Sequence, residues 1–377
     1  MLQSIKSRNS DIVIFFGSSK SLNTIESLKV QYFKEFNMDL DYDFVEINNI
    51  DDFDDYYLGF DKCIRDLSKE YKIFIDHTSG TKTMSMAAAI AALVYNKDLY
   101  VIEGERKNGA IIKGTETVKQ QNLYLAYDKM IIDKVKEFFN NNRFDSGLDL
   151  LEVVSDPKIN KDVYKQMFKA YSFFDKVNHK EALDNFNSKL FVDEFPNLKG
   201  KLQLNIKALN IINTEHKLKY VYTLASIFNN ADRRMTEFKY DDAIARLYRS
   251  FELIAQIRLY DEYGVDSSDV FLDDLDVDST YLEDLKLKVR DGKIKLGLVD
   301  DYVLLYNLGD SLGEFFMDNA RLILDKIKLR NTSILAHGLN YTSGEEYNSF
   351  RDIVYKAACI LDGDFDTYLS ETKFPVF

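Results

Sequence analysis

The chain has 377 residues, of which 46% are hydrophobic and 29% are charged, and its formal net charge is −13. This length allows two or three domains with packed cores, and the composition is that of an ordinary globular protein. The acidic charge argues against a broad basic surface for RNA or DNA. A nucleic acid is therefore expected to bind only in a local cleft that has its own positive groups.

The cysteines and the apolar segments indicate where the protein works. Cys63 and Cys359 are far apart and form no CxxC pair, which favours a reducing cytoplasm over a disulfide framework or a zinc site. The polar start of the chain does not read as a signal peptide, and the block MAAAIAALVY is too short to span a bilayer. We expect a cytoplasmic protein without a membrane anchor.

The first part of the chain alternates between strand and helix patterns, which predicts a doubly wound, Rossmann-like sheet. Strands are expected at residues 11–17, 41–48, 72–80 and 98–104, and helices at 18–36, 52–71 and 81–96. The alanine-rich last helix is apolar nearly all round and is expected to be buried. A hairpin is expected over residues 106–118, with Asn108-Gly109 as its turn.

Strand patterns almost vanish after this region, and the rest of the chain is expected to be helical. Two weakly similar helical hairpins are predicted at 128–154 and 164–190, and three later helices at 239–260, 311–338 and 344–363. An aspartate-rich stretch at 276–285 reads as a surface loop. The expected domains are an α/β domain (1–125), a helical linker subdomain (126–216) and a second all-α domain (217–377).

One candidate catalytic pair lies in the stretch LRNTSILAHGLN. Arg330 and His337 stand seven positions apart, so in a helix they share one face about 10 Å apart. This distance is too long for the pair to act alone on one phosphate. Two copies of the helix packed about a two-fold axis would bring two arginines and two histidines into one cleft. Alternatively, Gly338 is a helix C-cap and His337 only complements the helix dipole.

The chemistry of this pair suits RNA cleavage without a metal. Histidine transfers protons near neutral pH, and arginine stabilises the charge that grows on a phosphoryl group. The ribose 2′-OH would then attack the adjacent phosphate. The sequence suggests no metal-ligand cluster, because its histidines are scattered at His77, His179, His216 and His337.

Two loops at strand ends could bind phosphate. The stretch IDHTSGTKTM sets small and hydroxyl residues and a lysine between a buried strand and a helix, where open α/β sheets bind ligands. It is not a Walker P-loop, because Thr81 separates Gly80 from Lys82. The candidate residues of the two loops are Thr78, Ser79, Gly80, Thr81 and Lys82, and Gly17, Ser18, Ser19 and Lys20. The alternative is an ordinary pair of turns with Ser/Thr N-caps.

A third pattern is Arg246, Arg249 and Glu252, which fall at helical spacing. These side chains either line a groove or form pairs on the solvated face of an amphipathic helix, and the second interpretation is favoured.

The ordered combination of these motifs resembles the CARF–HEPN ribonucleases of type III CRISPR defence. Arg330, Asn331 and His337 match the R-x4–6-H signature of HEPN domains. The small-residue turn of CARF domains is matched by Asp76, Thr78, Ser79, Gly80, Thr81 and Lys82. The stretches RFDSGLDLLE and ARLYRSFELIAQ are similar to helices that precede the catalytic one in some members. The fold implied is a Rossmann-like CARF domain, an all-α linker and an all-α HEPN domain.

The resemblance implies a homodimer with two sites. Paired CARF domains would bind cyclic tetra- or hexa-adenylate, with phosphates on the Gly80–Lys82 loops and adenines near the Gly17–Lys20 loops. The HEPN dimer would then cut single-stranded RNA and leave a 2′,3′-cyclic phosphate, without a cofactor. His337 would transfer protons, Arg330 would stabilise the phosphorane-like state, and Asn331 would orient His337 or the phosphate. In some members the CARF pocket also cleaves the ring, a role that Thr78, Ser79 and Lys82 would have here.

Two other functions compete with this one. The chain could be a cyclic-nucleotide sensor whose HEPN part only dimerises or recruits a partner. It could also be a small-molecule enzyme on the α/β domain, which is disfavoured because no GxGxxG follows the first strand. A transcription factor is disfavoured by the acidic charge and by the lack of a basic recognition helix.

Overall fold

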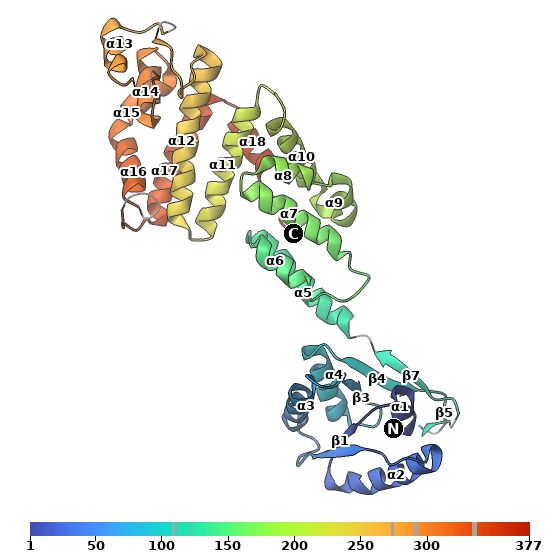
Figure 1. Ribbon diagram of the computed structural model, residues 1–377. Helices are drawn as coiled ribbons and strands as arrows, with labels where there is room; N and C mark the ends of the chain where they lie inside the picture. The colour runs from blue at the N-terminus through green and yellow to red at the C-terminus, as the bar shows by residue number, and fades with distance from the viewer. Residues whose placement is uncertain (108–109, 113, 122, 273–274, 290–292, 334–337) are drawn as a thin grey trace. The chain divides into compact units, whose positions relative to one another are not determined.

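The computed structural model describes residues 1–377 except 108–109, 113, 122, 273–274, 290–292 and 334–337. It consists of two compact units, Met1–Met130 and Ile131–Phe377. The first unit is α/β and the second is helical throughout its described residues (Figure 1). The predicted fold class, an α/β Rossmann-like domain followed by helical regions, is confirmed.

The strands of the first unit form parallel pairs, as expected for strands joined through helices. β1 pairs with β2 and β3 with β4, both in parallel, whereas β7 pairs antiparallel with the outer side of β4. Among the described residues, β1–β2 and β3–β4–β7 are separate ladders rather than one continuous sheet. The strands are β1 (Val13–Gly17), β2 (Tyr42–Glu46), β3 (Phe74–Asp76), β4 (Asp98–Glu103), β5 (Arg106–Lys107), β6 (Ala110–Ile111) and β7 (Thr117–Gln121).

The expected hairpin is present as β5 and β6, which pair antiparallel. Its turn residues, Asn108 and Gly109, lie outside the described residues. The polar start of the chain forms a helix that the sequence reading did not anticipate. The helices of this unit are α1 (Leu2–Arg8), the 3₁₀ turn η1 (Ser19–Ser21), α2 (Leu22–Phe36), α3 (Phe53–Leu67) and α4 (Lys82–Val94).

Helix α4 is buried on one face only, so the expectation that it is buried all round is wrong for the single chain. Ala87, Ala88, Ala91 and Ala92 are at most 2% exposed and pack in one core with residues of α3 and the strands. The opposite face carries Met86, Ile90 and Val94, which are 55%, 40% and 57% exposed. Their spacing of four residues makes a continuous apolar stripe along the helix.

The regular elements of the second unit are helices, and the first of them, α5, begins at the end of the first unit. The segment 276–285, expected to be a loop, contains α13, because Asp278 caps the helix by accepting from the Thr280 N–H (2.7 Å) and Leu285 is buried. The helices are α5 (Tyr124–Asn140), α6 (Phe144–Leu151), α7 (Lys161–Asp175), α8 (His179–Asp184), α9 (Ser188–Glu194), η2 (Pro196–Leu198), α10 (Lys199–Ile212), α11 (Lys219–Thr236), α12 (Tyr240–Tyr263), α13 (Ser279–Lys286), α14 (Leu298–Asn307), α15 (Ser311–Asp318), α16 (Ala320–Thr332), α17 (Gly344–Leu361) and α18 (Phe365–Thr372).

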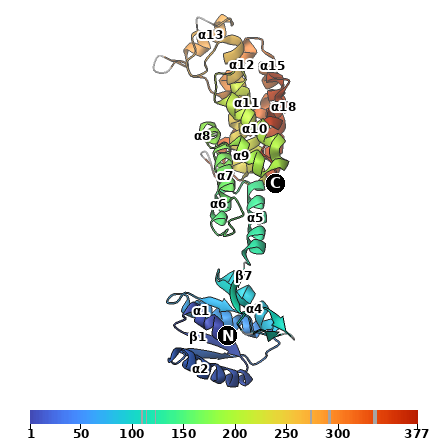
Figure 2. The ribbon, with the colours of Figure 1, turned by 90° about the vertical axis from the view of Figure 1, so that its right-hand side faces the viewer.

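Helix α12 is the centre of this unit. It lies beside α11 in both Figure 1 and Figure 2 and also packs against α14, α16 and α17. Phe251 of α12 stacks on Tyr302 of α14 at 4.4 Å between ring centroids, and Tyr302 stacks on Phe316 of α15 at 5.1 Å. These ring contacts pack α14 directly against α12, and α15 against α14.

A buried ionic network joins α7 to α11. The Asp175 carboxylate accepts from Arg233 Nε at 2.7 Å and from Arg234 Nη2 at 2.6 Å, and all three side chains are about 10% exposed. The Asn230 amide also donates to Asp175 (2.7 Å). A buried carboxylate with two guanidinium partners is strongly fixed, because removing any partner would leave an uncompensated buried charge.

The two helical hairpins expected from their sequence similarity share one turn geometry. Asn142 and Val177 have φ angles of 58° and 60°, and the next residue donates its N–H five residues back, from Arg143 to Phe138 O and from Asn178 to Phe173 O. This is the Schellman ending of a helix. The same turn recurs between α11 and α12, where Phe238 has a φ of 60°.

A carboxyl group that forms no ion pair among the described residues is buried in α14. Asp301 is 0% exposed, and burial raises its pKa to about 7, with Glu252 and Asp300 adding to the shift and Ser267 opposing it. At a pH between the ordinary pKa of 3.8 and the raised pKa of about 7, Asp301 keeps its proton in the folded chain but has released it in the unfolded chain. The free energy of unfolding therefore falls as the pH rises through this window.

We predict that Asp301→Asn stabilises the protein in a pH-dependent way. Each pKa unit corresponds to about 1.4 kcal/mol, so the gain in unfolding free energy should be about 3 kcal/mol larger at pH 8 than at pH 5. Urea denaturation at the two pH values measures it. The control is Asp300→Asn, whose carboxylate pairs with Lys288 at 2.5 Å. An equal gain from Asp301→Asn at both pH values would contradict the assignment.

Candidate functional site

The helix that carries Arg330 ends earlier than the sequence suggested. α16 stops at Thr332 and Ser333 is extended, so the expected helix over 311–338 is wrong at this end, and it also breaks between α15 and α16. The Thr332 hydroxyl donates to Lys328 O (3.1 Å) and the Ser333 hydroxyl to Arg330 O (2.9 Å). Such side-chain bonds compete with the helical backbone and explain the stop.

The chain then folds back onto the end of α16. The Gly338 N–H donates to Ser333 O (3.2 Å), and the Asn340 N–H donates to Thr332 O (3.0 Å). A Cβ atom at Gly338 would lie 1.9 Å from Thr332 O, so only glycine fits there. Gly338 is therefore not a helix C-cap but the point of closest approach of two backbone segments. His337 itself lies outside the described residues.

Arg330 is held by an aromatic ring. Its guanidinium carbon lies 4.8 Å from the ring centroid of Tyr248 in α12, and its Nη1 donates to Asn331 Oδ1 (3.0 Å). Burial raises the pKa of Tyr248, and Glu252 adds to this, whereas Arg330 lowers it. Among the described residues, no carboxylate is recorded within ion-pair distance of Arg330. Its charge therefore remains available to an anion.

The neighbouring charges on α12 are engaged within the protein. Arg249 donates to Glu252 (2.6 Å) and to Gln256 (2.9 Å), whereas Arg246 bonds to Asp242 and Asn230. The interpretation as intrahelical pairs on a solvated face is confirmed for Arg249 and Glu252, whereas Arg246 also reaches the buried Asn230 of α11.

The loop from Thr78 to Lys82 is a tightly bonded strand-to-helix turn. Asp76 accepts from the Thr78 N–H (2.7 Å), and Thr78 Oγ1 accepts from Ile102 N–H in the next strand (2.8 Å). Thr81 caps α4 by accepting from Met84 N–H (3.1 Å), and the Gly80 N–H reaches His77 O (3.4 Å).

These bonds leave fewer donors than a cradle of free backbone N–H groups would have. The exposed Ser79 and Lys82 remain accessible, with those first-turn N–H groups of α4 that Thr81 does not cap.

The loop from Gly17 to Lys20 has a similar arrangement. Gly17 is buried at the end of β1, where a Cβ atom would lie 2.7 Å from Ser21 Oγ. Ser18 precedes η1, and Ser19 and Lys20 within it are exposed. The hydrogen bonds described for the two loops connect each to its own surroundings and do not join them. Both follow strands that run parallel to a neighbour, but in separate ladders.

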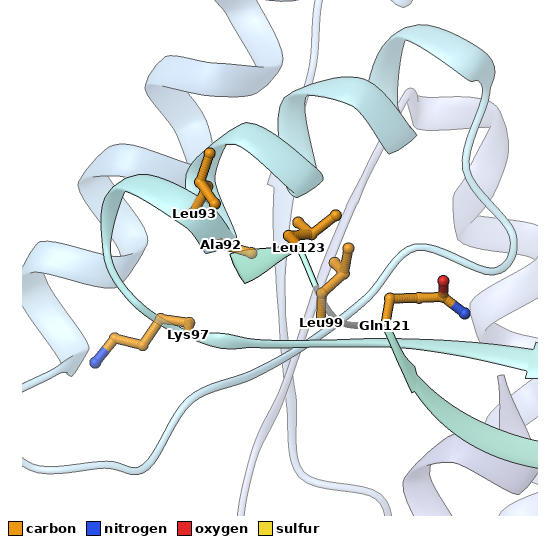
Figure 3. Close-up of a pocket in the computed structure, with 6 residues that line it drawn as sticks. All are labelled: Ala92, Leu93, Lys97, Leu99, Gln121 and Leu123. Atoms are coloured by element: carbon orange, nitrogen blue, oxygen red, sulfur yellow. The ribbon is translucent and has the colours of Figure 1, made fainter. Parts of the chain in front are cut away.

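A small pocket lies at the other end of α4 and is not part of these loops. It is lined by residues near the carboxyl end of α4 and the paired positions Leu99 and Gln121 (Figure 3). Its lining is Ala92, Leu93, Lys97, Leu99, Gln121 and Leu123. The Thr78–Lys82 loop, in contrast, precedes the amino end of the helix.

The described histidines have structural roles or stand alone. His179 is buried and its Nε2 lies 2.8 Å from Ser226 Oγ, and burial lowers its pKa to about 4. His216 Nδ1 accepts from the Leu218 N–H (3.0 Å). Among the described residues there is no group of three or more His, Cys, Asp or Glu placed to hold a metal ion. No helix in this part of the chain is long and apolar enough to cross a membrane.

Comparison with known families decides the assignment. A model of the Csm6 6H domain matches residues 127–218, and a model of the Csm6 HEPN domain matches residues 212–361. Together they span more than half of the chain. The chain belongs to the Csm6 family. The resemblance to CARF–HEPN proteins of type III CRISPR systems is thereby confirmed, and Arg330, Asn331 and His337 fall inside the matched HEPN region.

A solved structure extends the comparison over the first unit. Csm6 from Enterococcus italicus, solved bound to cyclic hexa-2′-fluoro-hexa-dAMP, matches with a TM-score of 0.65 and 14% identity. The match covers 99% of this chain and 93% of that one, so the whole fold is shared. No curated protein matches the chain. The domain limits 1–125, 126–216 and 217–377 and the roles of the candidate residues stay predictions.

Two tyrosines with a part in these sites escaped the sequence analysis. Tyr248 supports Arg330, and Tyr56 of α3 is 2% exposed and lies beside Thr81, which opposes the rise that burial causes in the pKa of Tyr56. Both lie on amphipathic helices, where the sequence pattern predicts that an aromatic residue belongs to the hydrophobic core. The only sequence signal for Tyr248 is its place within the ARLYRSFELIAQ stretch.

We predict that Gly338→Ala displaces the segment that follows Arg330. The added methyl group collides with the Thr332 carbonyl, and overpacking of this kind costs about 1–3 kcal/mol of unfolding free energy. Chemical denaturation measures the loss. Gly363→Ala is the matched control, because nothing lies within 4 Å of its Cβ position. The predicted close approach is wrong if both variants are as stable as the wild type.

Proposed function

We propose that the chain is a cytoplasmic endoribonuclease of antiviral defence that a cyclic oligoadenylate activates and that cuts single-stranded RNA without a metal. The observation that carries this proposal is the end of α16. Arg330, without an ion-pair partner among the described residues, is held over Tyr248, and Ser333 and Gly338 tie the segment containing His337 to the same helix end. Membership of the Csm6 family, with its HEPN domain, supports the same chemistry.

The active form in this proposal is a homodimer. Exposed apolar residues in the described part of the chain are available to a second copy. They include the Met86, Ile90 and Val94 stripe of α4, and also Leu322 and Leu324, which lie on opposite flanks of α16 and are 44% and 45% exposed. Two-fold packing of α16 would place two copies of Arg330 and His337 in one cleft.

The reaction follows from the chemistry of these side chains. One His337 accepts the proton of the ribose 2′-OH, whose oxygen attacks the adjacent phosphorus. The bond to the 5′-oxygen breaks, and the second chain's His337 gives that oxygen a proton. The products are a 2′,3′-cyclic phosphate and a 5′-hydroxyl end. Arg330 stabilises the extra negative charge in the transition state, and Asn331, bonded to Arg330, orients the arginine and the phosphate.

The activator would bind the first unit. Its phosphates would contact Gly80, Thr81 and Lys82, and its adenines would lie near Gly17, Ser18, Ser19 and Lys20. Lys82 is exposed at the first turn of α4, where the helix dipole also favours an anion. The cyclic hexanucleotide on the Enterococcus italicus protein supports a ring of adenylates, either tetra- or hexa-adenylate. Thr78, Ser79 and Lys82 would also cleave the ring in a self-limiting enzyme.

We predict that His337→Ala and Arg330→Ala abolish RNA cleavage by the activated protein. Removing a proton-transfer group lowers the rate about 10²–10⁴-fold, and removing a charge-stabilising donor about 10²–10³-fold. Cleavage of a labelled single-stranded RNA, with and without cyclic tetra- or hexa-adenylate and with EDTA, measures this.

Matched controls are available for both residues. His216→Ala removes an exposed histidine outside the proposed site, and Arg321→Ala removes an exposed arginine from the same helix as Arg330. Both controls should cut RNA at the wild-type rate. Activator binding without any RNA cleavage would favour the alternative, a sensor whose HEPN part only dimerises or recruits a partner.

We predict that Lys82→Ala weakens activator binding. A hydrogen bond from a charged donor is worth about 1.5–3 kcal/mol, so the dissociation constant should rise about 10- to 150-fold. Calorimetric titration with each ring size measures the change. Lys97→Ala, near the opposite end of α4, is the control and should bind as the wild type does. Unchanged binding by Lys82→Ala would remove the Thr78–Lys82 loop from the activator site.

A further inference from the structure

Three aromatic rings form an exposed cluster beside the end of α16. Phe238 meets Tyr240 at 6.3 Å between ring centroids, and Tyr240 meets Tyr341 at 6.4 Å, both nearly perpendicular. Phe238 is 78% exposed and Tyr341 is 75% exposed. We call these three residues the aromatic step. The rings come from two places about 100 positions apart, the α11–α12 turn and the segment after Gly338.

Phe238 occupies a backbone position that a phenylalanine adopts at a cost. Its φ of 60° is the left-handed conformation, which Asn142, Val177 and Gly309 adopt in comparable turns. Asparagine and glycine accept this conformation readily, whereas a bulky side chain does so rarely. Phe238 shares this strain with Val177, but most of the Phe238 ring is in solvent, where burial does not compensate the strain. The exposed ring is therefore available to a contact outside the chain.

Tyr341 is fixed between the catalytic helix and α12. On one side, the Asn340 N–H donates to Thr332 O (3.0 Å), two residues after Arg330. On the other, the fully buried Thr342 donates to Asp241 Oδ1 (2.6 Å) at the start of α12. The segment next to the ring is therefore held in place, while the ring remains open to solvent.

The distance from the aromatic step to Arg330 is about the length of a few stacked nucleotides. Arg330 lies over Tyr248, and Tyr240 is eight residues earlier on the same helix, which is about 12 Å along the axis. Stacked nucleotides of one strand are about 3.4 Å apart, so the interval corresponds to about three or four stacked bases. Lys239, in the same turn as Phe238, is 58% exposed and is paired with Glu237 at 2.8 Å, so the unpaired positive charge beside the step is that of Arg330 among the described residues.

We propose that the aromatic step stacks unpaired bases of the RNA beside the phosphate that is cut. This inference rests on the proposed ribonuclease function and adds residues that position its substrate. Every base has an aromatic face, so stacking on Phe238 and Tyr341 binds single strands with little sequence preference.

A second copy of the chain fits the step less well than RNA does. The rings project from a turn and a loop and not as a continuous helical stripe such as that of α4. Arg330 nearby, which has no ion-pair partner among the described residues, complements a polyanion.

The test uses Phe238→Ala and Tyr341→Ala in the full-length, activated protein. Stacking of one base contributes about a tenfold factor in affinity, so each variant should raise KM for a single-stranded RNA about tenfold, while kcat changes less than about twofold. Phe238→Tyr and Tyr341→Phe keep an aromatic face and should restore the wild-type KM. Phe271→Ala removes another exposed phenylalanine, 67% exposed, and should have no effect.

A second measurement separates stacking from a structural role. RNA with one abasic nucleotide at successive positions is bound to the cleavage-inactive His337→Ala protein, with and without Tyr341→Ala. At one position near the cut, base removal should weaken binding to the His337→Ala protein about tenfold but have little further effect once Tyr341 is absent. Light scattering follows the molar mass of each variant.

The outcomes distinguish this inference from the proposed function. If the wild type cuts RNA and both alanine variants keep its KM, the inference is wrong and the ribonuclease function stands. If the alanine variants dissociate a dimer that the wild type forms, the step is a contact between chains and the inference is also wrong. If the activated wild type neither binds nor cuts single-stranded RNA, the proposed function fails and the inference fails with it.

Discussion

The approach of Gly338 to the Thr332 carbonyl is so close that a single methyl group cannot be placed between them. This contact brings the chain back to the helix it has just left and decides what surrounds Arg330. Because α16 stops at Thr332, Gly338 and Asn340 return to the end of this helix through hydrogen bonds to Ser333 O and Thr332 O. The chain is therefore anchored on α16 and, through Thr342 and Asp241, on α12.

The same dependence on α12 appears in the rest of the helical unit. Tyr248 supports the guanidinium of Arg330, while Phe251, less than one turn further along, stacks in the core with Tyr302. The residue that touches the candidate site and the residue that stabilises the fold thus lie on one rigid element. In the α/β unit a single residue both stabilises the fold and belongs to a candidate site, because Thr81 caps α4 and lies in the candidate activator loop.

The alternation of strands and helices could be predicted because burial imposes period-two and continuous apolar patterns on strands and a 3.6-residue period on helices. The end of α16 could not be predicted, because the apolar sequence pattern continues through Ile334 and Leu335. The hydroxyl groups of Thr332 and Ser333 instead donate to backbone carbonyls of the last helical turn. The exposure of one face of α4 was also not predicted. An apolar helix pattern does not show whether each face packs against the same chain or against another one. Phe238 and Tyr341 escaped notice because no periodicity relates residues so far apart.

The carboxylate of Asp175 has a mechanical consequence. It is shared by Arg233 and Arg234, and Arg234 also contacts Glu237, whose other oxygen holds Lys239 in the turn next to Phe238. Apolar helix surfaces can slide past one another by small steps, whereas this relay would first have to break buried charge pairs. The buried pairs of Asp175 with Arg233 and Arg234 therefore resist sliding between the end of α7 and α11. A displacement of α7 would carry α11 with it, and with α11 the turn that contains Glu237.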